Sequence, residues 1–128
     1  MREMVQPAPV LIVDDSDSAR LVMAAILRKA GYQVEEASSG VEALKMAVAQ
    51  NYGVVITDLH MPDMDGDSLV NCLRKMSDYQ FTPILFASAE PADEIRHIGG
   101  EVRATGWISK PIKPDKLLSS LRRLLYPN

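Results

Sequence analysis

Apolar and polar residues follow two different spacings along the chain, and these two spacings alternate five times. Short segments that are mostly apolar, or apolar at every second position, have the length and pattern of β-strands. They cover residues 10–15, 32–37, 52–58, 82–89 and 106–109. The segments between and after them repeat apolar residues every three or four positions, as amphipathic helices do, and they cover residues 16–31, 40–51, 67–77, 91–98 and 113–126. The alternation predicts a parallel sheet with helices on both faces, joined by right-handed crossovers.

Four of the predicted helices have a distinct apolar face that should pack against the sheet. The residues expected to face inward are Ala19, Val22, Met23, Ile26, Leu27 and Ala30 in the first helix, Val41, Leu44, Ala47 and Val48 in the second, Leu69, Leu73 and Met76 in the third, and Leu117, Leu118, Leu121, Leu124 and Leu125 in the last. The fourth helix differs because it runs into Gly99 and Gly100. Since a glycine inside a helix costs about 1 kcal/mol, we predict that this helix is short or mobile.

The composition is that of one globular domain and gives no sign of nucleic-acid or membrane binding. The chain has 128 residues, of which 47% are hydrophobic and 24% charged, which is enough for one sizeable core. A net charge of −3 provides neither a basic surface for nucleic acid nor a polybasic membrane signal. The one cysteine, Cys72, cannot form an internal disulfide, and we interpret it as a small core residue.

The two ends of the chain set the expected domain boundaries. Residues 1–8 are predicted to be a short disordered lead, and residues 9–126 to form the domain. The lead lacks the apolar segment of a secretory signal, so a cytoplasmic location is expected. The chain stops directly after the last predicted helix, so we expect no output domain within it. Whether these residues are a whole protein or part of a longer one is left open.

Polar residues follow four of the five predicted strands. Asp14 and Asp15 end the first strand, Asp58 ends the third, and Ser88 and Lys110 come at the ends of the fourth and fifth. Because the carboxyl ends of parallel strands meet at one edge of a sheet, where such folds bind their ligands, we expect these side chains to lie together.

Three neighbouring carboxylates require either protonation or a cation. Two like charges about 4 Å apart cost roughly 4 kcal/mol near a protein surface. A site made of oxygen ligands suits Mg²⁺, with Mn²⁺ as the alternative ion. Zinc is not expected, because His60, His97 and Cys72 lack the spacing of zinc ligands.

Four motifs resemble the receiver domains of two-component response regulators, and especially the chemotaxis-type single-domain receivers. They are the acidic pair in "LIVDDSD", the stretch "ITDLHMPDMDG", the hydroxyl that follows "PILFA", and the Lys-Pro of "WISKPI". The resemblance extends over residues 9–126. It implies a flavodoxin-like (βα)5 fold, a doubly wound α/β structure whose parallel sheet has the strand order 2-1-3-4-5.

The resemblance also implies a role for each acidic residue. Asp58 corresponds to the phospho-acceptor. Asp15 is expected to bind Mg²⁺ directly and Asp14 to act on it through a water molecule. The backbone carbonyl of His60 is expected to complete the metal ligands supplied by the protein.

Other positions correspond to the phosphate-binding and switching residues of the family. Lys110 would pair with one phosphate oxygen and Ser88 would hydrogen-bond another, with a cis peptide expected before Pro111. Trp107 occupies the place of an aromatic residue that turns inward after phosphorylation, although tryptophan is bulkier than the tyrosine or phenylalanine usual there. The surface made by the fourth helix, the fifth strand and the fifth helix would then change.

Two positions that flank the expected site vary within the family and influence the lifetime of the phosphoryl group. They are occupied here by His60 and Glu90, which follow Asp58 and Ser88 by two residues. We interpret Asp63 and Asp65, beside Gly66, as turn residues and not as further metal ligands.

The function implied is a phosphorylation-controlled signalling receiver in a two-component phosphorelay. The phosphoryl group would come from a sensor histidine kinase or a histidine phosphotransfer protein, and a downstream effector protein or output domain remains unidentified. A phosphorylation-dependent dimer is a further option. Such a domain is not an enzyme in the usual sense, because it catalyses only its own phosphoryl transfer and autodephosphorylation.

Two other functions are compatible with parts of the pattern. One is a receiver-like binding module that is not phosphorylated. The other is an aspartate-nucleophile phosphohydrolase of the haloacid dehalogenase type, for which Asp15 and Asp17 offer the Asp-x-Asp pattern on the first strand. That enzyme would leave the loop after Asp58 unexplained.

Overall fold

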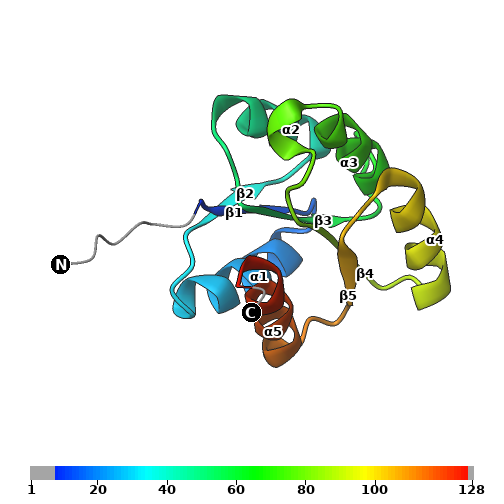
Figure 1. Ribbon diagram of the computed structural model, residues 1–128. Helices are drawn as coiled ribbons and strands as arrows, with labels where there is room; N and C mark the ends of the chain where they lie inside the picture. The colour runs from blue at the N-terminus through cyan, green and yellow to red at the C-terminus, as the bar shows by residue number, and fades with distance from the viewer. Residues whose placement is uncertain (1–7, 127–128) are drawn as a thin grey trace.

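The computed structural model describes residues 8–126 and contains a five-stranded parallel sheet flanked by helices (Figure 1). The strands are β1 (Val10–Val13), β2 (Val34–Ala37), β3 (Val54–Asp58), β4 (Ile84–Ser88) and β5 (Gly106–Ser109). The helices are α1 (Asp17–Lys29), α2 (Gly40–Ala49), α3 (Gly66–Arg74), α4 (Ala92–Val102) and α5 (Pro114–Leu125), with a 3₁₀ turn, η1, at Ser77–Tyr79. Except for Ala8, the predicted disordered lead lies outside the described residues.

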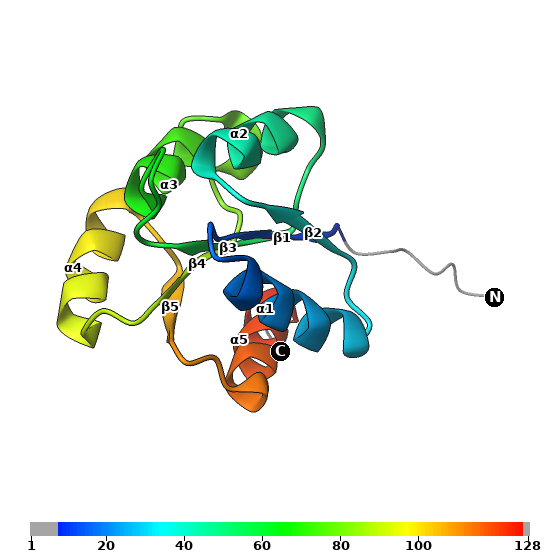
Figure 2. The ribbon, with the colours of Figure 1, turned by 180° about the vertical axis from the view of Figure 1, so that it is seen from behind.

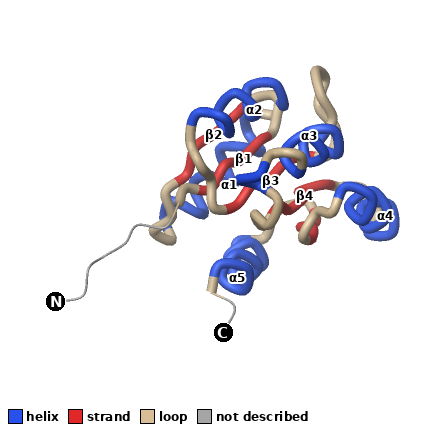
Figure 3. The backbone as a smooth tube through the Cα atoms, turned by 45° about the horizontal axis from the view of Figure 1, so that its top comes forward, coloured by secondary structure: helices blue, strands red, loops and turns tan. Residues whose placement is uncertain are grey.

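The sheet has the strand order β2-β1-β3-β4-β5, and all four strand pairs are parallel. This order confirms the predicted flavodoxin-like fold. Helices α2, α3 and α4 cover one face of the sheet, and α1 and α5 cover the other, as the two opposite views show (Figures 1 and 2). A third view shows the helices surrounding the strands (Figure 3). Among residues 8–126, no helix is both long enough and apolar enough to cross a membrane.

The central strands are apolar along their length because helices cover both of their faces. All four residues of β1 are buried, as are the first four of β3. Neighbouring residues of a strand point to opposite faces, so Leu11 contributes to the core beneath α2, α3 and α4, and Ile12 to the core beneath α1 and α5. The first polar side chains appear where the strands end, which places them all at one edge of the sheet.

The buried faces predicted for α1 and α2 were partly wrong, because some residues expected to face inward are exposed. Val22 of α1 is 51% exposed and Val48 of α2 is 74% exposed, and Val41 is exposed as well. Helix α2 instead buries Ala43 and Ala47 in the core beneath α2, α3 and α4, and Gly40 against Met64. Leu44 is only partly buried at the margin of this core. Cys72 of α3 is half-buried and not a core residue.

The fourth helix was predicted to be short or mobile, and the first alternative is wrong, because α4 continues through both glycines to Val102. Its mobility stays a prediction. Gly99 is buried, and a β-carbon there would meet Ala104 at 3.5 Å and the ring of Phe86 at 3.7 Å. Both are ordinary van der Waals distances, so an alanine would fit at this position against Phe86 of β4. The helix ends at Arg103, whose φ of 61° is left-handed.

Arg74 is a buried charged residue that the apolar pattern did not indicate. It is 6% exposed, and its guanidinium donates hydrogen bonds to the carbonyl groups of Tyr79, Thr82 and Arg103. Burial lowers the pKa of this guanidinium. Arg74 thus ties α3 to the segment before β4 and to the end of α4.

Candidate functional site

Three carboxylates meet at the carboxyl edge of the sheet. Asp14 and Asp15 follow β1, and Asp58 ends β3, the neighbouring strand. One carboxylate oxygen from each lies within 4.8 Å of the others. We call these three residues the acidic cluster. Its members were predicted from the sequence to lie together, and the parallel register of β1 and β3 brings them there.

Lys110, which follows β5, provides the cation of this cluster. Its Nζ lies 2.9 Å from Asp14 Oδ2 and 3.5 Å from Asp58 Oδ2. Burial alone would lower the pKa of the Lys110 ammonium, but its hydrogen bond to Asp14 and the charge of Asp58 outweigh burial and raise the pKa above its usual value. Lys110 therefore carries a positive charge between two carboxylates.

Asp14 and Asp58 have different surroundings. Asp14 is fully buried and accepts hydrogen bonds from the Ser16 N–H at 2.9 Å and from Lys110. Asp58 has 17% of its side chain exposed, and its Oδ1 accepts a hydrogen bond from the Leu59 N–H at 2.8 Å. Burial raises the pKa of Asp58, Lys110 lowers it and Asp14 raises it, with a net upward shift. Asp58 is thus a partly accessible carboxylate whose charge is incompletely compensated.

Ser88 is the last residue of β4, the strand next to β3. It is 2% exposed, and its Oγ accepts a hydrogen bond from the Glu90 N–H at 3.1 Å. The Ser88 carbonyl accepts a hydrogen bond from the Lys110 N–H at 2.9 Å, so the backbone of Lys110 is fixed to the end of β4. The peptide bond between Lys110 and Pro111 is cis.

Two aspartate side chains fix the conformation of the loop between β3 and α3 by accepting backbone hydrogen bonds. Asp63 accepts hydrogen bonds from the N–H groups of Gly40 and Val41 at the start of α2. These bonds, that from Val41 first, lower the pKa of Asp63, and a negative charge is favourable at a helix N-terminus. Asp65 accepts a hydrogen bond from the Met61 N–H at 3.2 Å. Asp63 and Asp65 therefore shape the loop and lie outside the acidic cluster.

Gly66 has a role beyond turning the chain. Its N–H donates to the Leu59 carbonyl at 2.7 Å, and a β-carbon at this position would overlap the carbonyl oxygen of Asp58. Sequence reasoning placed Gly66 in a turn but missed this contact. The signal that could have indicated it is the fixed interval of eight residues between Asp58 and a glycine at the start of a helix.

The side chains of His60 and Glu90 meet across the mouth of the site. His60 Nε2 lies 3.3 Å from Glu90 Oε1, and His60 Nδ1 lies 3.9 Å from Asp65 Oδ1. The His60 side chain is 59% exposed. The sequence indicated both residues as neighbours of the site, but not that they contact each other. Their contact connects the loop after β3 to the loop after β4.

Comparison with known proteins identifies the family to which this chain belongs. A family model described as the response regulator receiver domain matches residues 10–122. The chain belongs to this family. It is therefore a receiver domain of the kind found in two-component response regulators, as its motifs predicted.

Relatives of this receiver domain occur in proteins with different outputs. The transcriptional regulatory protein SrrA of Staphylococcus aureus is 33% identical over 116 residues, which are 91% of this chain and 47% of SrrA. The chain thus spans about half the length of that curated relative. The structure of the chemotaxis response regulator CheY4 of Vibrio cholerae matches with a TM-score of 0.88 and 44% identity over 93% of this chain and 99% of CheY4.

A third match comes from a kinase. The signal receiver domain of a signal transduction histidine kinase from Syntrophus aciditrophicus has a TM-score of 0.85 and 30% identity, over 94% of this chain and 91% of that one. The same receiver architecture therefore occurs in a transcriptional regulator, a chemotaxis protein and a kinase. The family assignment does not identify the output of this chain.

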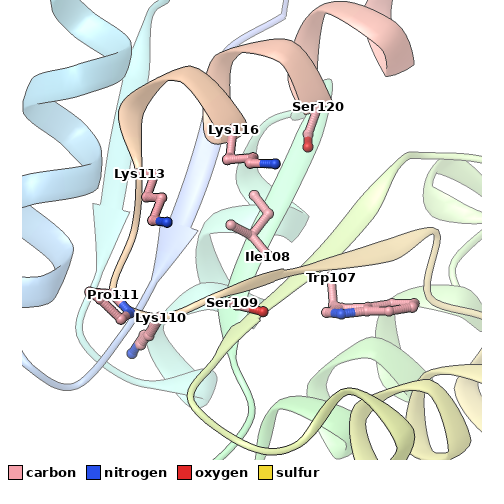
Figure 4. A pocket seen from close by; sticks show the side chains of 8 residues that line it. All are labelled: Trp107, Ile108, Ser109, Lys110, Pro111, Lys113, Lys116 and Ser120. Carbon is pink, nitrogen blue, oxygen red and sulfur yellow. The ribbon is translucent and has the colours of Figure 1, made fainter.

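Trp107 of the receiver lies on β5, three residues before Lys110, but on the side of α4. The Arg96 guanidinium of α4 lies 5.2 Å from the centre of the indole ring. Trp107 also lines an open pocket along β5 and α5, which has lysine side chains at its other end (Figure 4). The pocket residues are Trp107, Ile108, Ser109, Lys110, Pro111, Lys113, Lys116 and Ser120. Trp107 is therefore connected to Lys110, and so to the acidic cluster, along the chain of β5.

The acidic cluster fits a hard divalent cation. It offers only oxygen atoms, which Mg²⁺ prefers. Among residues 8–126, the ion pairs that reach the cluster all come from Lys110, so three carboxylates share one ammonium group. The remaining negative charge favours a bound cation, and neither histidine belongs to the cluster.

Proposed function

We propose that this receiver domain accepts a phosphoryl group on Asp58 in a Mg²⁺-dependent reaction, and that phosphorylation changes the surface of α4, β5 and α5 to regulate a partner. The observation that carries the proposal is the position of Asp58. It ends the central strand β3, is partly exposed, belongs to the acidic cluster and lies 3.5 Å from Lys110. Of the described carboxylates, only Asp14 and Asp58 form ion pairs with Lys110, at the edge of the sheet where such folds bind ligands.

The transfer would begin with the ionised Asp58 carboxylate. One of its oxygens attacks the phosphorus of a phosphohistidine on a sensor histidine kinase or a histidine phosphotransfer protein. The new O–P bond forms as the P–N bond breaks, and the electron pair of that bond stays with the imidazole, which takes up a proton. Lys110 would pair with one oxygen of the phosphoryl group, and the Ser88 hydroxyl would donate a hydrogen bond to another.

The residues proposed to hold Mg²⁺ are those of the acidic cluster and one backbone group. Asp15 and Asp58 would bind it directly, Asp14 would act through a water molecule, and the His60 carbonyl would complete the protein ligands. Mn²⁺ could replace it, since both ions prefer oxygen ligands. When bound, the ion supplies positive charge that offsets the phosphoryl oxygens.

The response would start at Ser88. Aspartyl phosphate places more negative charge and additional acceptor oxygens beside Lys110 and the Ser88 hydroxyl. Movement of Ser88 towards these oxygens would leave space behind it, into which Trp107 would turn. His60 and Glu90 close the mouth of the site, and we propose that they influence how long the phosphoryl group persists.

We propose the partners only as classes of protein. The phosphoryl donor would be a sensor histidine kinase or a phosphotransfer protein, and the regulated partner is an effector or output domain of unidentified kind. Three further expectations stay predictions. They are a phosphorylation-dependent dimer, a domain that spans residues 9–126, and a cytoplasmic location. The phosphohydrolase and the unphosphorylated binding module are not favoured, because the chain belongs to the receiver family.

The proposal can be tested by intact-protein mass spectrometry after incubation with acetyl phosphate and MgCl2. The wild-type chain should gain the mass of one phosphoryl group, and Asp58→Asn should not. Asp67→Asn provides the matched control, because it removes a carboxylate of α3 outside the acidic cluster. Chelation of Mg²⁺ should abolish the adduct.

Two outcomes would contradict the proposal. A wild-type chain that gains no phosphoryl group under any of these conditions would support the unphosphorylated binding module. Continued hydrolysis of acetyl phosphate by Asp58→Asn, together with loss of that activity in Asp15→Asn, would support the phosphohydrolase.

A further inference from the structure

Arg20 of α1 is a charged residue that the proposed chemistry does not use, yet it contacts the backbone of the acidic cluster. Its side chain is only 13% exposed, and all three guanidinium nitrogens have partners. Nη1 donates to the carbonyl of Asp14 at 2.7 Å, Nε to Glu36 at 3.1 Å and Nη2 to Asp17 at 2.7 Å. The hydrogen bond that Arg20 donates to Asp17, and next the one to Glu36, outweigh burial and raise the pKa of Arg20, so the group is permanently charged.

Arg20 makes its contact with the Asp14 carbonyl where β1 ends and the turn to α1 begins. The pairing of β1 with β2 ends at Val13, with one further hydrogen bond from the Asp14 N–H to the Ala37 carbonyl. The Asp14 carbonyl is the first group of the turn that carries Asp14 and Asp15 to α1. Arg20 connects this carbonyl to Glu36 of β2 and to Asp17 in the first turn of α1. The turn that presents two carboxylates is thereby fixed to a strand and to a helix.

We propose that Arg20 is a positioning residue for the acidic cluster, which holds the turn after β1 so that Asp14 and Asp15 present their carboxylates to Mg²⁺. This inference rests on the proposed function, since it concerns the same metal site. Arg20 touches neither the metal nor the phosphoryl group in this role. It acts through the backbone of Asp14, much as groups behind metal ligands orient those ligands.

A positioning role and a purely electrostatic role of Arg20 predict opposite effects of its replacement on Mg²⁺ binding. If only its charge mattered, replacing it by a neutral residue would make the surroundings of the cluster more negative and would strengthen Mg²⁺ binding. If its hydrogen-bond geometry matters, the same replacement would release the turn and weaken Mg²⁺ binding. The direction of the change therefore separates the two explanations.

Arg28 provides an unusually close control within the same helix. It lies two turns after Arg20, contacts the same Glu36 at 3.0 Å, and likewise donates to a backbone carbonyl, that of Val34 at 3.0 Å. Val34 lies at the start of β2, at the opposite end of that strand from the acidic cluster. Replacing Arg28, which is 49% exposed, removes an ion pair and a carbonyl contact of the same two kinds, neither of which reaches the cluster.

The experiment is a titration with MgCl2 alone, followed through backbone amide signals in NMR spectra of wild type, Arg20→Gln, Arg20→Lys and Arg28→Gln. Arg20→Gln should weaken Mg²⁺ binding by about tenfold, the lower end of the effect seen for groups that orient metal ligands. Arg20→Lys should also weaken it, because lysine keeps the charge but its single nitrogen lacks the planar fork with which the guanidinium reaches three separate acceptors. Arg28→Gln should bind Mg²⁺ as the wild type does.

A second readout separates positioning from general loss of stability. Phosphorylation of Asp58 by acetyl phosphate should require more Mg²⁺ in Arg20→Gln, yet approach the wild-type rate once Mg²⁺ is saturating. Thermal unfolding of Arg20→Gln and Arg28→Gln gives the structural cost of each set of contacts. If Arg20→Gln does not fold, Arg20→Lys provides the decisive comparison with Arg28→Gln.

The possible results are distinct. Unchanged or stronger Mg²⁺ binding in the folded Arg20 variants, with normal binding by the wild type, overturns the positioning role and leaves the proposed function intact. Equal weakening in Arg28→Gln also overturns it, because the effect would then follow from stability alone. A wild-type chain that binds no Mg²⁺ contradicts both the inference and the proposed function.

Discussion

Asp58 and Asp14 share the cation of Lys110, but the fold stabilises their charges to different degrees. The buried Asp14 makes the shorter contact with Lys110, 2.9 Å, and also accepts the Ser16 N–H. Asp58 lies 3.5 Å from Lys110, and its burial and the nearby Asp14 raise its pKa. The folded state thus disfavours the ionised form of Asp58, whereas the Asp14 carboxylate accepts hydrogen bonds from Ser16 and Lys110.

Neutral replacements should therefore have opposite effects on stability. At pH 7, Asp58→Asn should raise the free energy of unfolding by about 1 kcal/mol, because a poorly compensated charge is removed. Asp14→Asn should lower it by about 2 kcal/mol, the value of a hydrogen bond between charged groups. Thermal or urea unfolding of both variants without Mg²⁺ measures these changes. Destabilisation by Asp58→Asn at pH 7 would contradict the prediction.

The pH dependence follows from the upward shift of the Asp58 pKa. In the window between the ordinary aspartate pKa of about 3.9 and the higher folded value, the folded state binds more protons, so stability falls as pH rises. The cost of ionised Asp58 is complete above the folded pKa and absent below the unfolded one. The advantage of Asp58→Asn should thus disappear as pH falls through this window, and an advantage that persists at the low end would be inconsistent with it.

The sequence predicted the members of the acidic cluster because each follows directly from one strand end. Asp14, Asp15 and Asp58 needed only the rule that parallel strands end at the same edge. The contacts of Arg20 and Asp63 could not be predicted in this way. They join a side chain to the backbone of another element, so they depend on where two loops or helices meet in space.

At the scale of helices, periodicity located every helix but did not always identify its buried face. In α2 the sequence offers a stripe of larger apolar residues and a stripe of small ones, and hydrophobicity favours the first. The structure buries Ala43 and Ala47 and exposes Val48, so the helix is rotated from the face that hydrophobicity favours. In α4 the propensity cost of two glycines did not end the helix, which continues through both of them to Val102.

Two glycines at helices provide a matched test of how closely α3 must approach Asp58. In Gly66→Ala the new methyl group would overlap the Asp58 carbonyl oxygen, whereas in Gly100→Ala it would meet no atom within 4 Å outside the helix. Gly66→Ala should cost about 2 kcal/mol or more through strain, and it should impair phosphorylation of Asp58. Gly100→Ala should stabilise α4 by about 0.5–1 kcal/mol.

The measurement for both glycine variants is urea unfolding together with acetyl phosphate labelling. Gly100→Ala should be labelled as efficiently as the wild type, since Gly100 is exposed and lies on α4. Normal stability and labelling of Gly66→Ala would show that α3 can move away from β3 without consequence, and the close approach of Gly66 would then have no functional meaning.

At the scale of the whole molecule, β5 connects the acidic cluster to the surface expected to change. Lys110 follows the strand and reaches Asp14 and Asp58, while Trp107 near its start contacts α4. The order of the strands was implied by resemblance, and their alternation with helices by the sequence pattern. The contact between Trp107 and Arg96 was not predictable, because it depends on how α4 lies beside an edge strand.

Arg96 should oppose the inward turn proposed for Trp107. Its guanidinium lies over the indole in the present orientation of the ring, and its side chain is 63% exposed. A cation–π contact at an exposed site is worth about 0.5–1 kcal/mol. If the contact is made only before activation, Arg96→Gln should tighten the binding of beryllofluoride, a mimic of the phosphoryl group, by about two- to fivefold.

His97→Gln is the matched control for Arg96→Gln, because His97 is the next residue of α4 and its contact is with Glu101, 3.6 Å away. Titration of each variant with beryllofluoride in the presence of Mg²⁺, followed by the fluorescence of Trp107, gives the dissociation constants. His97→Gln should match the wild type. Equal affinities of Arg96→Gln and wild type would mean that the indole keeps its contacts when Asp58 carries the mimic. In that case, the signal from Asp58 to the surface of α4, β5 and α5 would have to pass through Lys110 and the backbone of β5 without rotation of Trp107.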